Sequence, residues 1–359
     1  MRSRRLLIIN RTQFGYHTDT YYYCKYLKND FQITYLCWNQ NFPIVDESGI
    51  NVIYIKRARN VFSNYFIFLS NVIKRLKEFS TKVDVVFLKY FQFCFVIKVI
   101  KKQKNIILDI RTGPVKKFLL HRIIRFLLLK FELIFFDKIS IISESLAKKL
   151  NIINKNPYII PLGANSLTNK IANFDKIKLI YVGTFKNRNI HETVQGLAKY
   201  LNTLDCNKTV VSYYLIGTGP EKDIKKIKLS IEHNNLKEIV KLTGYVSHDK
   251  LGYYLENSNV GVSYIPMTSY FDYQPPTKTF EYLLSGMPVL ATKTFENQKV
   301  INENNGVLIF DNADSFYNGL VEISKKIFNS NEIKVRSQNF SWDFIIKEKL
   351  FPILDGFSD

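Results

Sequence analysis

Short runs of β-branched and aromatic residues alternate with helical patterns along nearly the whole chain, and this alternation restricts the fold more than any other feature. Between the runs, apolar residues recur with helical spacing, for example over Thr18–Lys28 and Val61–Phe79. Repeated βα units of this kind predict an α/β protein with doubly wound parallel sheets. The predicted strands are Leu6–Asn10, Ile33–Cys37, Val52–Ile55, Val83–Leu88, Ile106–Ile110, Lys138–Ile142, Lys178–Val182, Val210–Ile216, Val240–Leu242, Val260–Tyr264 and Val289–Ala291.

The alternation is interrupted once, by the extended segment Asn156–Asn165 and a polar link that runs to about residue 176. A chain of 359 residues is long enough for two domains that each bury a core. We therefore predict two Rossmann-like domains, with the boundary between residues 163 and 164. Because ligands of open α/β sheets bind beyond the carboxyl ends of the strands, functional residues are expected where strands end.

Positive charge is concentrated in the first half of the chain. Up to Gly163 there are 28 Lys and Arg against 10 Asp and Glu, whereas the remainder has 23 against 21. This asymmetry predicts an anionic surface or partner for the first domain. Nucleic acid is not expected as a partner, because the sequence has neither a helix-turn-helix nor an RNP-like motif; a non-catalytic nucleic-acid-binding protein remains a remote alternative.

The sequence also bears on location and metal binding. Its first apolar run, Leu6–Ile9, is too short for a signal peptide, and charges interrupt the apolar segment Phe118–Phe136. The four cysteines form no CxxC pair and have no histidine at ligand spacing. They are interpreted as buried thiols in a reducing cytoplasm, and no metal or cofactor is predicted.

Four strand ends in the second half carry glycine and charge. "LIYVGTFKNRN" contains Lys186 and Arg188, "YLIGTGPE" and "VKLTGYV" end in glycine turns, and "PPTKTFEYLLSGMPVLAT" places Glu281 in a short helix. Each motif alone has a plain explanation as a turn, as solvated loop charges, or as an i, i+3 pair of Lys278 with Glu281. Together, glycine turns, helix N-termini and Arg188 favour an anionic ligand such as a diphosphate. Neither a Walker loop nor a GxGxxG fingerprint is present.

In this order the motifs resemble the donor-binding half of family 4 glycosyltransferases, which have the two-domain GT-B fold. The resemblance is strong from Ile142 through Phe310, including "YIIPLGAN", "NVGVSYIP" and "NNGVLI", whereas residues 1–140 match only in outline. It implies two domains facing a cleft, with residues 1–163 and a returning helix 341–359 on the acceptor side and residues 164–340 on the donor side. It further implies a retaining, metal-independent transferase that uses a nucleotide-diphosphate sugar.

The resemblance also implies site residues. Glu281 would bind the ribose hydroxyls, the amides around Thr277, Lys278 and Thr279 would face the phosphates, and Arg188 or Lys186 would bind the diphosphate. As the nucleotide diphosphate leaves, these groups would stabilise its charge, and the leaving phosphate itself could take the proton of the acceptor. Two positions depart from the family pattern, Tyr273 where a first Glu is usual and Thr184 where Arg is common. The other predicted donor-site residues are Gly183, Gly217, Gly219, Tyr245 and Val246.

Two strand ends in the first domain suggest the acceptor side. The first loop contains Gly15 and Tyr16 beside His17, which is either an acid–base group or a solvated turn residue. The second contains Asp109 and Arg111. These two either form a buried ion pair, or Asp109 accepts a proton or hydrogen bond from the acceptor hydroxyl while Arg111 binds phosphate.

The segment Pro114–Phe136 mixes bulky apolar residues with the bases Lys116, Lys117, Arg122, Arg125 and Lys130. It is either a core helix with a basic solvent face or an interfacial helix on an anionic membrane, and the charge bias favours the second. The predicted protein is therefore cytoplasmic and peripheral on the inner face of the membrane. A glycan or lipid-linked acceptor in bacterial surface polysaccharide synthesis (O-antigen, capsule or exopolysaccharide) is predicted, with a GT-B-like nucleotide-sugar epimerase as the alternative.

Overall fold

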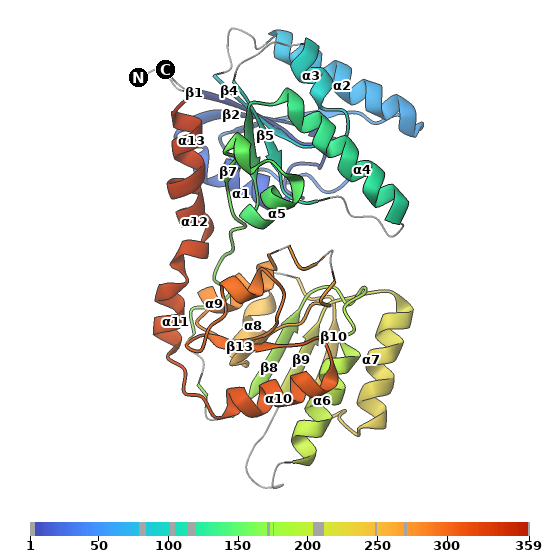
Figure 1. Cartoon of the computed structure of the whole chain (residues 1–359), viewed down its shortest axis with the longest axis vertical. Coiled ribbons are helices and arrows are strands. Elements are labelled where there is room, and N and C mark those ends of the chain that lie inside the picture. The colour runs from blue at the N-terminus through green and yellow to red at the C-terminus, as the bar shows by residue number, and fades with distance from the viewer. Residues whose placement is uncertain are drawn as a thin grey trace. The chain divides into compact units, whose positions relative to one another are not determined.

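The computed structural model describes residues 4–78, 84–100, 105–113, 119–170, 173–174, 176–203, 212–247, 250–268, 271–273 and 275–357. The chain forms two compact units, shown in Figure 1. Unit 1 comprises Met1–Leu162 and Trp342–Asp359, and unit 2 comprises Gly163–Ser341. The predicted pair of Rossmann-like folds is confirmed, because each unit is built around its own parallel sheet.

Unit 1 alternates strands and helices in the predicted way. Its elements are β1 (Arg4–Ile9), α1 (Thr18–Leu27), β2 (Phe31–Trp38), β3 (Ile50–Ile55), α2 (Val61–Glu78), β4 (Val85–Lys89), α3 (Phe95–Ile100), β5 (Ile106–Ile110), α4 (Leu119–Glu132), a 3-10 turn (Leu133–Phe135), β6 (Lys138–Ile141), α5 (Glu144–Leu150), a second 3-10 turn (Ile153–Lys155) and β7 (Tyr158–Ile159). All residues of β5 are buried, as expected for a strand with both faces covered.

The sheet of unit 1 has the strand order β3-β2-β1-β4-β5-β6-β7, and its neighbours pair in parallel. The order reverses between β1 and β4, so the loops after these two strands diverge at the carboxyl edge of the sheet. Such a switch point is where open α/β sheets bind ligands.

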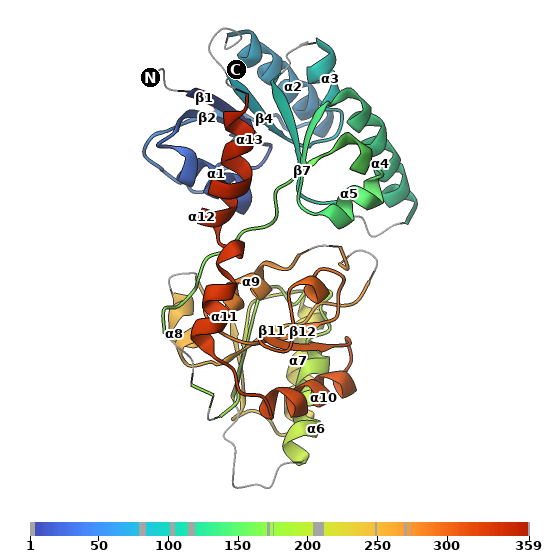
Figure 2. The same cartoon turned by 60° about the vertical axis from the view of Figure 1, so that its left-hand side comes forward.

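The chain end returns to unit 1 through α12 (Trp342–Ile345), a π-helical segment (Ile346–Leu350) and α13 (Phe351–Asp355), visible in Figures 1 and 2. The indole of Trp342 stacks on Tyr22 of α1 with ring centroids 5.1 Å apart. Phe351 packs edge-on against Phe31 at the start of β2, at 6.0 Å. These aromatic contacts fix the last segment to the sheet of unit 1.

Unit 2 repeats the pattern. Its elements are β8 (Lys178–Val182), α6 (His191–Asn202), β9 (Ser212–Ile216), α7 (Glu221–His233), β10 (Val240–Gly244), α8 (Leu251–Glu256), β11 (Val260–Ser263), α9 (Thr277–Leu284), β12 (Val289–Thr292), a 3-10 turn (Asn297–Lys299), β13 (Gly306–Ile309), α10 (Ala313–Ser324), α11 (Ser330–Arg336) and a 3-10 turn (Gln338–Phe340). The parallel order is β10-β9-β8-β11-β12-β13, so the switch point lies between β8 and β11.

Several helices begin where the sequence offers a capping side chain. Ser143 accepts a hydrogen bond from the Leu146 amide at the start of α5, and Asn312 accepts one from Ser315 at the start of α10. The predicted helix over Pro114–Phe136 begins at Leu119 in the structure and ends in a 3-10 turn; Lys116 and Lys117 and the side chain of Arg122 lie outside the described residues. No described helix has the length and apolar character needed to cross a bilayer.

Candidate functional site

Three loops at the carboxyl edge of the second sheet are joined by backbone hydrogen bonds. The Gly183 amide donates to the Ile216 carbonyl at 2.9 Å, and the Gly217 amide donates to the Gly244 carbonyl at 2.8 Å. Gly217 has φ = 146°, and a Cβ atom there would lie 1.8 Å from the Gly183 carbonyl oxygen. Only glycine fits so close a backbone contact. The predicted glycines therefore hold the loops after β8, β9 and β10 together as one surface.

Lys278, in the first turn of α9, reaches this surface. Its Nζ atom lies 3.8 Å from the centroid of the Tyr181 ring, and a Cβ atom at Gly183 would approach Nζ to 3.2 Å. The cation is thus held against an aromatic face beside the β8 glycine turn. The first amides of α9 have no acceptor within the helix, so the same place also presents helix N–H groups.

Arg188 and Glu281 belong to the same charged cluster. The Arg188 Cζ atom lies 4.0 Å from the centroid of the Phe271 ring, and Arg188 hydrogen-bonds to Tyr181, the residue under Lys278. Glu281 lies one helical turn beyond Lys278. Burial lowers the pKa of Lys278 to about 7, with Arg188 lowering it further and Glu281 opposing the shift. Two cations and one carboxylate from separate strand ends therefore meet at one site.

Burial also raises the pKa of Glu281 to about 7, against the opposing effect of Lys278. Removal from water disfavours the charged form of both groups, so each lies near its midpoint at neutral pH. An anionic ligand opposite Lys278, and hydroxyl donors opposite Glu281, would favour the charged forms of both. The site is therefore prepared to bind a group that carries negative charge and hydroxyls.

The other residues that were predicted to bind the sugar donor have different surroundings. The prediction for Thr279 is corrected, because its side chain is turned into the core. Its amide donates to the Pro276 carbonyl at 3.1 Å, its hydroxyl donates to Asn297 Oδ1 at 3.0 Å, and the hydroxyls of Thr279 and Ser263 are hydrogen-bonded at 2.8 Å. Lys186 and Thr184 are exposed on the β8 loop, and Tyr245 is exposed after β10. The other three are half-buried: Gly219, Val246, which packs on the core, and Tyr273, whose ring lies 5.5 Å from Phe295.

Sequence reasoning missed two residues of the cluster. Tyr181 supports Lys278 and hydrogen-bonds to Arg188, and Phe271 lies under the Arg188 guanidinium. Tyr181 precedes the Gly183 turn by two residues on β8, so an aromatic side chain at a strand end was the available signal. Phe271 lies between strands, and no local pattern marked it.

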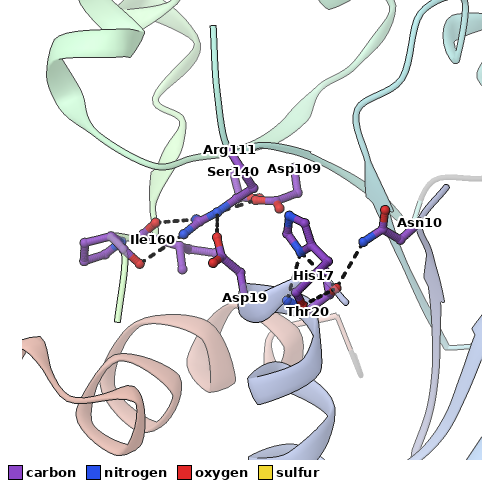
Figure 3. Close-up of polar contacts among 9 residues, drawn as sticks. Asn10, His17, Asp19, Thr20, Asp109, Arg111, Ser140 and Ile160 are labelled. Atoms are coloured by element: carbon purple, nitrogen blue, oxygen red, sulfur yellow. Dashed lines mark hydrogen bonds and ion pairs between the residues drawn. The ribbon is translucent and has the colours of Figure 1, made fainter. Parts of the chain in front are cut away.

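A second polar cluster lies at the carboxyl edge of the first sheet (Figure 3). Arg111, directly after β5, forms an ion pair with Asp19 of α1 and donates to the carbonyls of Ile160 at 2.6 Å and Pro161 at 3.3 Å. Its guanidinium is 4.0 Å from Asp109 Oδ1. The role predicted for Arg111 as a phosphate ligand is therefore corrected, since the side chain is buried and its donors are used inside unit 1.

Asp109 differs from its neighbour, because one of its oxygens is unused. Ser140 donates to Oδ1 at 2.8 Å, whereas the buried Oδ2 has no hydrogen-bond partner among the described residues. Burial raises the pKa of Asp109 to about 6, although Arg111 and Ser140 oppose the shift. An unsatisfied buried oxygen is uncommon, and it marks Asp109 as a candidate for a functional role.

His17 caps α1 and is not a solvated turn residue. Its Nδ1 atom accepts a hydrogen bond from the Thr20 amide at 3.3 Å (Figure 3). Burial, together with Lys89 and Arg111, lowers the pKa of His17 to about 3, so the ring is neutral at pH 7. Since Nδ1 is the acceptor, the ring proton is on Nε2. His17 can therefore donate a hydrogen bond from Nε2, but that nitrogen is not available as a base.

The remaining first-loop residues hold the loop in place. The Tyr16 hydroxyl donates to the Pro43 carbonyl at 2.9 Å, and Gly15 has φ = 87° at a position where a Cβ atom would lie 2.4 Å from Val45. Lys89, which ends β4, was missed as a member of the cluster. Burial lowers its pKa to about 8, while Asp109 and Asp19 oppose that change. A lysine at the end of an apolar strand was the available signal.

Comparisons with known proteins bear on the fold and on the family of unit 2. Residues 176–326 match the family model described as glycosyl transferases group 1. Among solved structures, a glycosyltransferase from Rickettsia africae ESF-5 has a TM-score of 0.73 at 14% identity, covering 99% of both chains. Sucrose-phosphate synthase from Thermosynechococcus elongatus has a TM-score of 0.70 at 17% identity, covering 98% of this chain and 99% of that one. HepE from Anabaena, solved with UDP and glucose, has a TM-score of 0.69 at 11% identity, with coverage of 98% and 100%.

A comparison with curated proteins finds no significant match. The chain therefore has the GT-B fold, and its residues 176–326 are similar to glycosyl transferases group 1. The family match lies within unit 2, and the resemblance to family 4 glycosyltransferases of the GT-B fold found in the sequence is confirmed.

Proposed function

We propose that the protein transfers a sugar from a nucleotide-diphosphate sugar to a glycan or lipid-linked acceptor, with retention of the anomeric configuration and without an essential metal. The observation that carries this proposal is the meeting of Lys278, Glu281 and Arg188 at the carboxyl edge of the second sheet. A nucleotide-diphosphate sugar offers the two features that this cluster is prepared to bind, an anionic diphosphate and a pair of ribose hydroxyls.

In the proposed complex, the Glu281 carboxylate accepts hydrogen bonds from the ribose hydroxyls, and Lys278 and Arg188 face the diphosphate. The bond between the sugar C1 and the phosphate oxygen breaks, and negative charge grows on the diphosphate. Lys278, Arg188 and the first amides of α9 stabilise this charge as it develops, which is the charge that a metal would otherwise neutralise. The acceptor oxygen bonds to C1 on the same face, and its proton passes to the departing phosphate oxygen.

Solved structures with the same fold support the donor and the pathway. HepE from Anabaena has been solved with UDP and with UDP-glucose, which favours a uridine nucleotide as the first donor to test. Another similar structure is a lipopolysaccharide outer core galactosyltransferase, with a TM-score of 0.68 at 14% identity. Surface polysaccharide synthesis is accordingly the proposed pathway.

On the acceptor side, we assign different roles to His17 and Asp109. The neutral His17 ring is suited to donate a hydrogen bond from Nε2 to a substrate oxygen. Asp109 has an unpartnered oxygen and a raised pKa, so it is suited to accept a hydrogen bond from the hydroxyl group that attacks. Arg111 pairs with Asp19 and lies 4.0 Å from Asp109, so its role is to position Asp109 and it is not itself a ligand.

Replacing Glu281 by glutamine tests the donor site. A neutral amide accepts more weakly than a carboxylate, and hydrogen bonds to charged groups are worth about 1.5–3 kcal/mol. We therefore expect Glu281→Gln to weaken UDP binding about 10- to 100-fold in a calorimetric titration.

Glu238→Gln is the matched control, because Glu238 is an exposed carboxylate of the same unit. Equal UDP affinity of Glu281→Gln and the wild type would remove Glu281 from the site. Incubation with a UDP-sugar alone separates transfer from the epimerase alternative, since only an epimerase would release an isomerised nucleotide sugar without an acceptor.

The affinity for UDP is expected to depend on pH with a maximum near neutrality. Glu281, with a pKa of about 7, loses its charge as the pH falls, so binding weakens on the acid side. Lys278, with a pKa of about 7, loses its charge as the pH rises, so binding also weakens on the alkaline side. Titrations between about pH 5 and pH 9 should show both limbs, and Lys278→Met should abolish the alkaline one. A flat profile would contradict the assignment of both groups.

We further propose that unit 1 docks on an anionic membrane through α4. Large apolar side chains are exposed along this helix and the turn after it, at Leu120, Ile123, Ile124, Leu127, Phe131 and Ile134. Isolated exposed apolar residues are ordinary, but a continuous row of them marks an interaction surface. Arg125 lies on the same helix, and the first 163 residues carry the excess of Lys and Arg over Asp and Glu. An anionic bilayer complements both the apolar row and the charge.

Binding to vesicles that contain about 30 mol% phosphatidylglycerol should weaken as the salt concentration rises, because salt screens the attraction between the basic residues and the lipid headgroups. Basic residues near such a surface contribute about 1 kcal/mol each. Leu127→Asn should reduce co-sedimentation with these vesicles, since Leu127 is 60% exposed on α4. Phe66→Asn, a change at an exposed apolar residue of α2, is the control. Equal recovery on neutral vesicles would contradict electrostatic docking.

A further inference from the structure

A pocket of about 370 Å³ lies at the carboxyl edge of the first sheet and is distinct from the Asp109 cluster. Arg11 follows β1 by two residues, Tyr90 and Phe91 directly follow β4, and Thr112 follows β5. The pocket therefore spans the switch point between β1 and β4, the place where open α/β sheets bind ligands.

Two arginines line this pocket. Arg11 is half-buried, and its guanidinium lies 5.9 Å from the centroid of the Phe91 ring; Arg125 comes from α4. Neither arginine takes part in an ion pair between the residues that the structure describes. Among the described residues that line the pocket, none is a carboxylate. The pocket is consequently a place where two positive charges are available to an anion.

The carboxylate of Glu132, next to the pocket, already accepts hydrogen bonds within unit 1. Glu132, at the end of α4, is buried, and its carboxylate accepts hydrogen bonds from the Phe93 amide at 2.8 Å and the Tyr90 hydroxyl at 3.3 Å. It ties α4 to the loop after β4 and so shapes the wall of the pocket. Both of these bonds are to Oε1, and Oε2 accepts from the Cys94 thiol at 3.6 Å, so both carboxylate oxygens already have donors and the charge of the two arginines is left for a ligand.

The other wall is apolar and continues onto the exposed row of α4. Leu128 and Leu129 line the pocket together with Arg125. Ile124 and Leu127 lie on the neighbouring stripe of the same helix, with 54% and 60% of their surface exposed. An occupant can therefore place an anionic group between the arginines while an apolar chain runs along α4. A free phosphate would use the first feature but not the second.

We propose that this pocket binds the phosphate or diphosphate headgroup of a lipid, with Arg11 and Arg125 on the phosphate oxygens and the lipid chain along α4. The inference rests on the proposed function and deepens it, since it gives the acceptor a phosphate-bearing apolar anchor. Guanidinium groups suit this role, because they present paired donors to phosphate oxygens. Thr112 in the pocket and Asp109 lie three residues apart at the end of β5, so the anchor would lie beside the proposed acceptor group.

Farnesyl diphosphate, used below its aggregation concentration, is the probe for the full-length chain, with inorganic pyrophosphate and farnesol as its separate halves. We expect farnesyl diphosphate to bind at least about tenfold more tightly than either half, in a calorimetric titration. Arg11→Gln and Arg125→Gln should each weaken its binding about tenfold or more, as expected for a lost charge-assisted contact. Lys74→Gln, which removes an exposed charge from α2, should leave binding unchanged.

Equal affinity for pyrophosphate and farnesyl diphosphate would overturn the lipid anchor. If Lys74→Gln weakened the binding of farnesyl diphosphate as much as Arg11→Gln and Arg125→Gln do, the binding would be general electrostatic attraction and the proposal would be wrong. Arg11→Lys is used if Arg11→Gln does not fold, because lysine keeps the charge but not the paired donors. Unchanged affinity for farnesyl diphosphate in both Arg11→Lys and Arg125→Gln would also overturn the proposal. UDP binding is measured on the same samples. If the wild type binds UDP but not farnesyl diphosphate, this inference alone is wrong. If the wild type does not bind UDP, the proposed function is wrong.

Discussion

Lys278→Met is expected to lower turnover about 10²–10³-fold, the loss typical of removing one donor that stabilises charge in a transition state. The Lys278 ammonium lies 3.8 Å over the Tyr181 ring, next to the Gly183 turn and within electrostatic reach of Arg188 and Glu281. Methionine keeps an unbranched apolar chain against Tyr181, so the change removes the charge with little loss of packing. The measurement is steady-state release of UDP from a UDP-sugar.

Lys241→Met is the matched control, because Lys241 is an exposed lysine of the same unit whose partner, Glu238, is exposed as well. Its turnover should equal that of the wild type. A change of less than about twofold in Lys278→Met would show that the charge of Lys278 does not act on the leaving group. In that case Arg188 and the α9 amides would have to carry the charge stabilisation alone.

Arg111→Met is expected to lower the free energy of unfolding of unit 1 by about 3–5 kcal/mol, because it leaves two buried carboxylates without their cation. Arg111 forms an ion pair with Asp19 and lies 4.0 Å from Asp109, and all three side chains are buried. Urea unfolding followed by tryptophan fluorescence reports on unit 1, since both tryptophans of the chain, Trp38 and Trp342, belong to it.

The double variant Arg111→Met with Asp19→Asn should recover part of this loss, because it removes one of the uncompensated charges as well. Arg75→Met is the control, since the pair of Arg75 with Glu78 is at the surface and such pairs are worth at most about 1 kcal/mol. A loss below about 1 kcal/mol in Arg111→Met would mean that Asp19 and Asp109 do not depend on Arg111 for their charge.

Much of the fold could be predicted from local patterns. Strands such as Ile106–Ile110 and Lys178–Val182 have the predicted limits, because a strand buried on both faces is a continuous apolar run bounded by polar residues. β7 and β13 were not among the predicted strands: β7 has only two residues, and β13 begins with Gly306 directly after two asparagines, a pattern typical of a turn. Elements this short are set by pairing with a neighbour and leave little periodicity to read.

The candidate site divides in the same way. Gly183, Arg188, Lys278 and Glu281 could be found from the sequence, because each stands in a strand-end loop or in the first two turns of a helix that the motifs mark. Phe271 could not, since its role comes from the guanidinium that lies over it, and Tyr181 was marked only by its place near a strand end. The partner of Arg111 could not be predicted from the sequence either. Asp19 is 92 residues away along the chain, and only the packing of α1 against the end of β5 brings the two side chains together.

The chain's own residues thus determined the βα order, the parallel sheets, the glycine turns and the position of the cluster around Lys278, because these follow from hydrophobic period and from short-range backbone geometry. Tertiary structure alone decided which charges are buried, which are paired and which are left for a ligand. Thr279 is turned into the core, Arg111 is paired with Asp19, and Asp109 has one oxygen that bonds to none of the described residues. The physical reason is that desolvation and ion pairing depend on everything packed around a group, whereas hydrophobic period depends only on its neighbours along the chain.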